Sequence, residues 1–136
     1  MRHTTADRRE WVPVYESLVP MLRVEDASDS VKFYGELGFK VVHSLEEDGR
    51  LVWAHLECGK AAVMVSEQPG EVETAPGHGP ILYLRPVDAP ALRARLEEKR
   101  RLPGPLRKTD FGMTEFEVLD PDGYELWIGS PAPDTA

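Results

Sequence analysis

A histidine and a glutamate two positions apart are the residues best placed for acid–base or metal chemistry. His55 and Glu57 lie in the apolar segment Leu51–Glu57. Because alternate residues of a strand face the same side, both side chains would share one face. Such a pair can act as a general base with its orienting carboxylate, form half of a metal site, or make ordinary hydrogen bonds in a polar groove. The spacing leaves all three interpretations open.

Other reactive groups have simpler explanations. The only cysteine, Cys58, precedes the expected Gly59 turn and has no base near it in the sequence, so we expect no catalytic thiol. A single cysteine excludes an internal disulfide and a cysteine zinc cluster, and it fits a cytoplasmic location. Turn chemistry accounts for the Asp120-Pro-Asp-Gly segment. The chain lacks the glycine-rich phosphate loops and the paired-histidine zinc motif.

Length and charge narrow the possible functions. The chain has 136 residues, of which 41% are hydrophobic and 29% charged, which suits one domain or two half-size units. Its formal net charge of -8 repels phosphate backbones, so we expect no nucleic-acid partner. The same charge favours cationic small molecules. No apolar run is long enough to span a membrane, and the N-terminus lacks a signal-peptide pattern.

Apolar periodicity predicts two helices among short strands. The first helix contains Val31 and Leu37, with Ser28 or Asp29 as its N-cap, and ends at Gly38; the second spans Ala89–Arg101. Acidic turn residues are expected over Glu46–Gly49. The expected strands are Leu18–Val24, Phe39–Leu45, Leu51–Glu57, Ala61–Ser66, Ile81–Arg85, Met113–Leu119 and Tyr124–Gly129, with a weak strand or loop at Arg107 and Lys108.

The order of these elements repeats. Val19–Asp26 aligns with Ile81–Asp88, and Val63 and Trp127 each lie four residues after a turn glycine. The expected fold is therefore α+β, built from two βαβββ modules. The predicted segments are an N-terminal extension (1–17), a first module (18–67), a linker rich in glycine and proline (68–80), a second module (81–130) and a tail (131–136).

Two stretches at opposite ends of the modules carry a family resemblance. LRVEDASDSVKFYGELGFKVV (Leu22–Val42) and DPDGYELWIG (Asp120–Gly129) resemble the vicinal oxygen chelate superfamily of glyoxalases, extradiol dioxygenases and bleomycin-resistance proteins. The resemblance implies a cupped mixed sheet with helices on the outside. It also implies a homodimer in which each groove borrows residues from the partner.

Metal-using members of this family hold their ion on the first and last strands of each module. In this chain those places fall on Val19, Val63, Ile81 and Trp127. None of these side chains offers the imidazole nitrogen or carboxylate oxygen that a divalent metal needs. The resemblance therefore leads us to expect no metal, no other cofactor and no catalytic residue.

If those four places face the cup, period-two alternation identifies its other residues. The aromatic residues would stack on a ligand, the glutamates would attract positive charge, and Arg85, with Arg23 beside Met21, would orient acceptors. An alternative is that this face packs in a dimer interface, with its glutamates solvated. The predicted ligand-binding residues are Trp53, His55, Glu57, Tyr83, Arg85, Met113, Glu115, Glu117, Glu125 and Trp127.

Two functions follow from the resemblance. The first is a binding protein of the bleomycin-resistance type, which sequesters a cationic aromatic antibiotic without transforming it. The alternative is a divergent, metal-dependent lyase or isomerase of the glyoxalase type, or a dioxygenase-related enzyme. That enzyme would need an unusual ligand set, for example His55, Glu57, Glu115 and Glu117.

Overall fold

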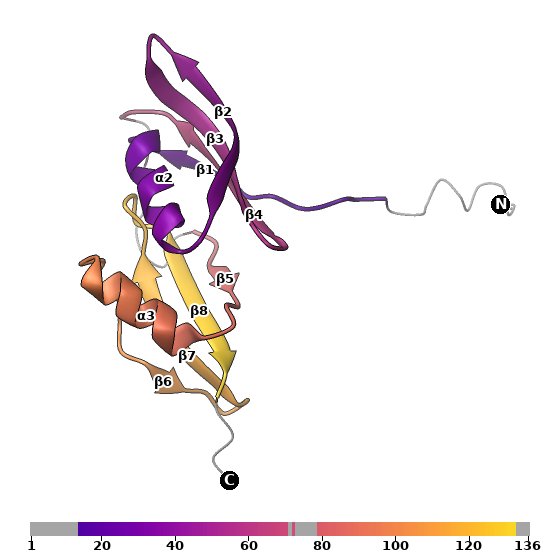
Figure 1. Cartoon of the computed structure of the whole chain (residues 1–136), viewed down its shortest axis with the longest axis vertical. Helices are drawn as coiled ribbons and strands as arrows, with labels where there is room; N and C mark the ends of the chain where they lie inside the picture. The colour runs from indigo at the N-terminus through magenta and orange to yellow at the C-terminus, as the bar shows by residue number, and fades with distance from the viewer. Residues whose placement is uncertain (1–13, 71, 73–78, 133–136) are drawn as a thin grey trace, which may run out of the picture.

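The computed structural model describes residues 14–70, 72 and 79–132, arranged as two modules along the long axis of the molecule (Figure 1). Part of the predicted extension, most of the predicted linker and the end of the predicted tail lie outside the described residues. The first module contains β1 (Met21–Val24), α2 (Ala27–Glu36), β2 (Lys40–Glu47), β3 (Arg50–Cys58) and β4 (Ala61–Glu67). The second contains β5 (Leu82–Leu84), α3 (Ala89–Glu98), β6 (Arg107–Lys108), β7 (Met113–Leu119) and β8 (Glu125–Pro131).

Both modules have the same topology. Their sheets run in the orders β1-β4-β3-β2 and β5-β8-β7-β6. The β1/β4 and β5/β8 pairs are parallel, and the remaining pairs are antiparallel. The α+β class and the two-module architecture are thus confirmed. Within the part of the chain that the structure describes, no helix is long and apolar enough to cross a membrane.

Strand alternation divides each sheet into a covered face and an open face. In the first module Leu22, Leu56 and Val65 are buried in the core, which α2 joins through Phe33 and Tyr34. In the second module the corresponding strands bury another apolar set, packed with α3. The second set comprises Leu96, Phe116, Val118, Leu126 and Ile128. The opposite faces of the two sheets remain available for other contacts.

Matched aspartates cap the two helices. The Asp26 side chain accepts a hydrogen bond from the Asp29 backbone N–H at 3.1 Å, and the Asp88 side chain accepts one from Ala91 at 3.0 Å. The N-cap of α2 is therefore Asp26, and the prediction of Ser28 or Asp29 was wrong. Asp26 has extended backbone angles, as an N-cap requires, whereas Ser28 and Asp29 already lie within the helix.

Two element ends differ from the sequence prediction because of left-handed residues. Helix α3 ends at Glu98 rather than Arg101, since Arg100 has a φ of 61° and turns the chain. Strand β2 continues through Glu47, so the hairpin needs only Asp48 and Gly49, with φ values of 52° and 76°. An Asp-Gly pair is well suited to such a two-residue turn.

A buried hydrogen bond joins the modules. The Tyr34 hydroxyl on α2 donates to the Asp120 carboxylate at 2.8 Å. Asp120 also accepts from the backbone N–H groups of Asp122 and Tyr124, both at 2.9 Å. Burial raises the pKa of Tyr34 well above its usual value, so the phenol remains a donor. Burial also raises the pKa of Asp120, although its three hydrogen bonds oppose that shift.

Removing this inter-module hydrogen bond should destabilise the protein. We predict that Tyr34→Phe lowers the free energy of unfolding by about 1–3 kcal/mol, because a buried carboxylate loses one donor. Urea denaturation at pH 7 measures the change. Tyr124→Phe is the matched control, since its hydroxyl donates to the Arg23 carbonyl at 2.8 Å in an exposed setting. Equal losses in the two variants would contradict the importance of burial at Asp120.

Candidate functional site

The open face of the second sheet brings together most of the predicted residues of that module. Tyr83, Trp127 and Glu117 are direct cross-strand neighbours on β5, β8 and β7. Glu115 and Met113 continue the same face along β7. This arrangement places two aromatic rings beside two carboxylates, as the alternation predicted.

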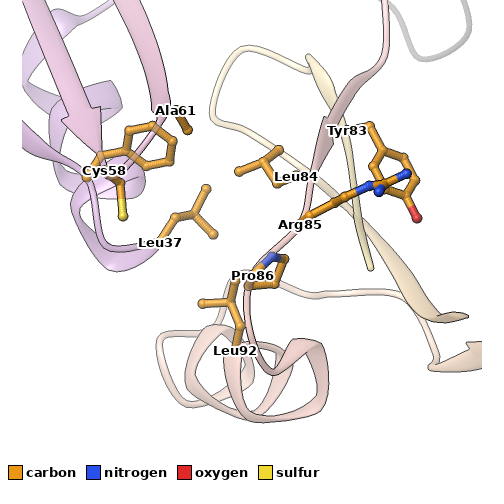
Figure 2. A pocket seen from close by; sticks show the side chains of 9 residues that line it. Leu37, Cys58, Ala61, Tyr83, Leu84, Arg85, Pro86 and Leu92 are labelled. Carbon is orange, nitrogen blue, oxygen red and sulfur yellow. The ribbon is translucent and has the colours of Figure 1, made fainter. Parts of the chain in front are cut away.

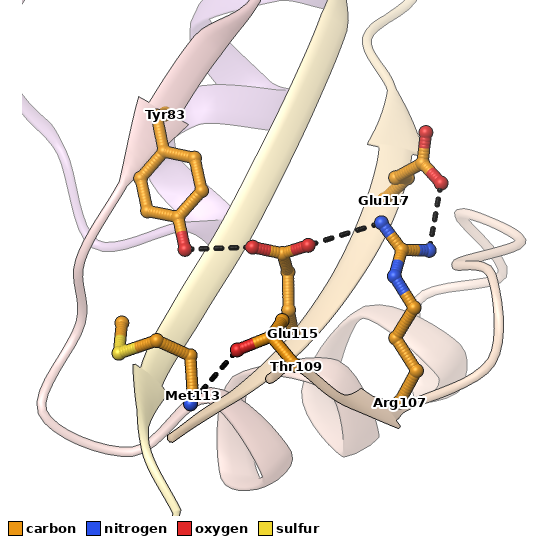
Figure 3. A network of polar contacts seen from close by, with 6 residues as sticks. All are labelled: Tyr83, Arg107, Thr109, Met113, Glu115 and Glu117. Carbon is orange, nitrogen blue, oxygen red and sulfur yellow. Dashed lines mark hydrogen bonds and ion pairs between the residues drawn. The ribbon is translucent and has the colours of Figure 1, made fainter. Parts of the chain in front are cut away.

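A polar network organises these side chains (Figure 3). The Tyr83 hydroxyl donates to Glu115 at 2.7 Å, and Arg107 donates to Glu115 at 3.0 Å and to Glu117 at 2.9 Å. The Glu115 side chain is only 4% exposed, so both of its oxygens depend on these partners. Burial, followed by the hydrogen bond to Glu115, raises the pKa of Tyr83, which keeps the phenol protonated.

Gly129 makes the Tyr83 contact possible. It lies on β8, directly opposite Glu115 on β7, and Tyr83 reaches across it from β5. A Cβ atom at position 129 would lie 2.5 Å from the Tyr83 hydroxyl oxygen. A side chain there would push the phenol away from Glu115. A glycine inside a strand is a known signal of such close approach, but it does not reveal which side chain approaches.

Arg107 is the main site residue that the sequence did not identify. It lies on the two-residue strand β6, directly opposite Glu115, and its guanidinium carbon is 5.5 Å from the centre of the Trp127 ring. Glu115 and Glu117 are therefore ion-paired rather than free to attract a ligand, which corrects the role predicted for them. With Arg107 added to Arg23 and Arg85, the candidate binding residues include three arginines and the four predicted glutamates.

Trp127 has an unsatisfied polar atom. Its indole Nε1 is buried and has no hydrogen-bond partner among the described residues. A buried donor without an acceptor has a free-energy cost that an incoming acceptor would remove. Beside Trp127, Tyr83 is 40% exposed, and the Arg85 guanidinium lies 5.8 Å from its ring centre. The aromatic pair thus combines accessible stacking surface with an unused donor.

The open face of the first sheet carries the predicted histidine pair. His55 Nε2 lies 3.1 Å from a Glu57 carboxylate oxygen, so these two side chains do share a face and interact. Trp53 lies on the same face, next to Leu45 on β2. His43, for which the sequence suggested no partner, is directly opposite His55, and their ring centres are 6.3 Å apart.

Val63 was assigned to the wrong face. It pairs with Leu56 and is 2% exposed in the core, whereas Met64 lies on the open face opposite Met21 and His55. The error arose from counting residues after the turn glycines. Only two residues separate the paired ends of β3 and β4, whereas five separate Leu119 from Glu125. A one-residue difference in register exchanges the two faces of a strand.

The residues do not fit the divalent metal that the family resemblance implies. After the correction, the four places are occupied by Val19, Met64, Ile81 and Trp127, which offer one thioether and no imidazole or carboxylate. The alternative set is divided between two sheets, and Arg107 engages both Glu115 and Glu117. Among the described residues, no group of three or more His, Cys, Asp or Glu side chains could hold a metal ion.

A separate apolar hollow lies between the modules (Figure 2). Its volume is about 190 Å³, below the range of about 300–1,000 Å³ typical of drug-sized ligand pockets. The predicted site residues Tyr83 and Arg85 line one side of it. The other lining residues are Leu37, Phe39, Cys58, Ala61, Leu84, Pro86 and Leu92. The hollow is thus too small for a large antibiotic.

A comparison with models of known protein families identifies the family of this chain. Residues 17–128 match the model of the Glyoxalase/Bleomycin resistance protein/Dioxygenase superfamily. The chain belongs to this superfamily. A comparison with curated proteins finds no significant match.

Solved structures share the fold at low sequence identity. TioX from Micromonospora sp. ML1 is 21% identical, with 86% of this chain and 99% of that chain covered and a TM-score of 0.71. The bleomycin resistance determinant encoded on transposon Tn5 is 20% identical, with coverages of 86% and 98% and a TM-score of 0.65. TnmS3, an antibiotic binding protein from Streptomyces sp. CB03234, is 19% identical, with coverages of 89% and 99% and a TM-score of 0.67.

The network on the second sheet should depend on Arg107. We predict that Arg107→Gln lowers the free energy of unfolding by about 1–2 kcal/mol, because the buried carboxyl group of Glu115 loses one of its two hydrogen-bond donors. Chemical denaturation at pH 7 measures the change. Lys108→Gln removes the adjacent positive charge and should leave the unfolding free energy nearly unchanged. A loss of the same size in Lys108→Gln would attribute the effect to net charge.

Proposed function

We propose that this protein binds and sequesters a small cationic aromatic molecule, such as a bleomycin-like antibiotic, without transforming it. The observation that carries this proposal is the open face of the second sheet, where Tyr83 and Trp127 lie beside Glu115 and Glu117. Flat aromatic surface suits stacking, and a cation above such rings gains additional attraction.

Electrostatics support a cationic ligand despite the arginine on this face. Arg107 pairs with both Glu115 and Glu117, so the attraction of a cation does not rest on these two carboxylates. The whole chain carries a formal net charge of -8, which raises the local concentration of cations around it. The local pairing then has a different role, because it holds the carboxylates in fixed positions where they can orient a bound ligand.

The side chains at the positions where the family holds its metal favour binding over catalysis. Met64 and Trp127 occupy the places on the last strand of each module, and neither can hold a hard divalent ion. Trp127 instead adds stacking surface and an unused indole donor. Two of the structures that share the fold are described as a bleomycin resistance determinant and an antibiotic binding protein, which is consistent with this use of the fold.

We further propose that two copies of the chain form a dimer through their open faces. Large apolar side chains on these faces are exposed, including Met21 (60%), Leu45 (61%) and Leu119 (46%). Exposed apolar side chains on the face of a sheet favour association. In the dimer, the first-sheet face of one protomer would close over the second-sheet face of its partner, and the ligand would lie between them.

Ligand binding should be visible through the tryptophans. In a Trp11→Phe background, titration with bleomycin and with a panel of cationic aromatic drugs should produce a saturable change in fluorescence. Trp127→Leu should weaken binding by about 1–3 kcal/mol, or about tenfold for each 1.4 kcal/mol, as measured by calorimetry. Leu102→Ala is the control, because Leu102 is 87% exposed and follows α3 rather than lying on a sheet.

Two results would contradict the binding function. The first is the absence of any response across the panel together with no protection of cells that express the protein. The second is equal binding by wild type and Trp127→Leu, which would remove the second-sheet face from the site.

The dimer can be tested independently of the ligand. We predict that wild type has the mass of a dimer by light scattering, and that Leu45→Glu shifts it to monomer by placing a charge in the interface. The free energy of unfolding of the monomer should change little, because Leu45 is exposed within one chain. Leu102→Glu introduces the same charge elsewhere and should remain dimeric. A monomeric wild type would overturn this assembly.

A further inference from the structure

Four side chains with soft or nitrogen donors form a single row across the first sheet. The strand register places Met21 opposite Met64, Met64 opposite His55, and His55 opposite His43. The row therefore crosses all four strands in the order β1-β4-β3-β2. All four side chains lie on the open face, because each is directly paired with the next.

The spacing suits a shared ion. Directly opposed side chains on adjacent strands have Cβ atoms about 4.5–5.5 Å apart, so neighbouring donors can converge on one point. The His43 and His55 ring centres are 6.3 Å apart. Metal–nitrogen bonds of about 2.0–2.1 Å place two coordinating nitrogens about 3.3–4 Å apart, which rings at this separation can present. Met64 is the next side chain in the row after His55.

The donor types select a class of metal. Thioether sulfur is a soft ligand that favours Cu(I), and imidazole also binds copper, whereas Ca²⁺ and Mg²⁺ require oxygen donors. Two methionines and two histidines in one row therefore suit a soft monovalent ion. This set is distinct from the four places where the family holds its divalent metal, with which it shares only Met64.

A carboxylate supports one of the ligands. Glu57 lies 3.1 Å from His55 Nε2, which leaves Nδ1 as the nitrogen available for coordination. Histidines that bind metals commonly donate their second ring N–H to a carboxylate, which fixes the tautomer and the ring orientation. The His55 side chain is only 16% exposed, so its position is restricted. Within one protomer, the exposed side chains of Met21 and His43 leave the row accessible.

We propose that the Met21–Met64–His55–His43 row binds one Cu(I) ion between neighbouring members, with Met64 and His55 as its central ligands. This site does not require the proposed antibiotic binding, because its four side chains all lie on the first sheet and the main drug contacts are assigned to the second sheet. In the proposed dimer, the row would line the first-sheet side of the ligand cavity. The two sites can therefore be present or absent separately.

The test uses the full chain in a Cys58→Ser background, since the exposed thiol of Cys58 would itself bind a soft metal. Cu(I) is titrated without oxygen in competition with a colorimetric chelator, and Ag(I) is the redox-inert probe for NMR. With ¹³C-labelled methionine methyl groups, one equivalent of Ag(I) should shift the signals of Met21 and Met64. The signal of Met113, on the second sheet, should stay in place.

Matched variants identify the ligands. Met64→Leu and His55→Phe should each weaken Cu(I) binding at least tenfold, while Met113→Leu should leave it unchanged. Circular dichroism of each variant establishes that it is folded. His43→Phe provides a second variant at an exposed position, where the substitution leaves the core intact.

Three outcomes would overturn the proposal. They are no binding of Cu(I) in competition with the chelator, a shift of Met113 equal to that of Met64, and undiminished binding by folded Met64→Leu and His43→Phe variants. Failure of this site leaves the test of drug binding intact, because the effect of Trp127→Leu is measured by calorimetry and needs no metal.

Discussion

The Asp120 carboxylate is the group on which both the fold and the candidate site depend. It accepts backbone hydrogen bonds from Asp122 and Tyr124 and so closes the turn between β7 and β8. The closed turn sets the register that places Trp127 opposite Glu117 on the open face. The same carboxylate accepts the Tyr34 hydroxyl of the other module. One buried side chain thus takes part both in the geometry of the second module and in its attachment to the first.

Local signals were sufficient to predict most of the fold. Strand β7 begins and ends where alternation placed it, and the repeat matched Asp26 with Asp88, which prove to be equivalent helix caps. The prediction for Val63 is wrong because one residue more or fewer in the preceding turn reverses the face of the sheet on which a side chain lies. The sequence shows where a turn lies, but the number of residues in its closed loop is set by pairing between the strands.

The site features that the sequence did not predict share one physical cause. Arg107 lies on a strand of only two residues, which the sequence indicates only as a weak strand or loop. It acquires its role from Glu115 and Glu117 on the neighbouring strand. Gly129 matters because Tyr83 crosses it from another strand. Alternation predicts which residues share a face, but not which of them neutralise one another. The sequence therefore places Glu115 and Glu117 on the same face, but it does not show that Arg107 pairs with both of them.

The repeat also explains how one fold can present two different surfaces. Met21 and Met64 in the first module occupy the same paired positions as Tyr83 and Trp127 in the second. Across the next strand, His55 corresponds to Glu117. Because the backbone places these side chains alike, the difference between the surfaces comes from side-chain chemistry alone. Thioether and imidazole groups provide soft donors in one module, whereas aromatic rings and an ion-paired carboxylate provide a stacking surface in the other. A duplicated fold can therefore acquire separate binding properties in each half without changing its core.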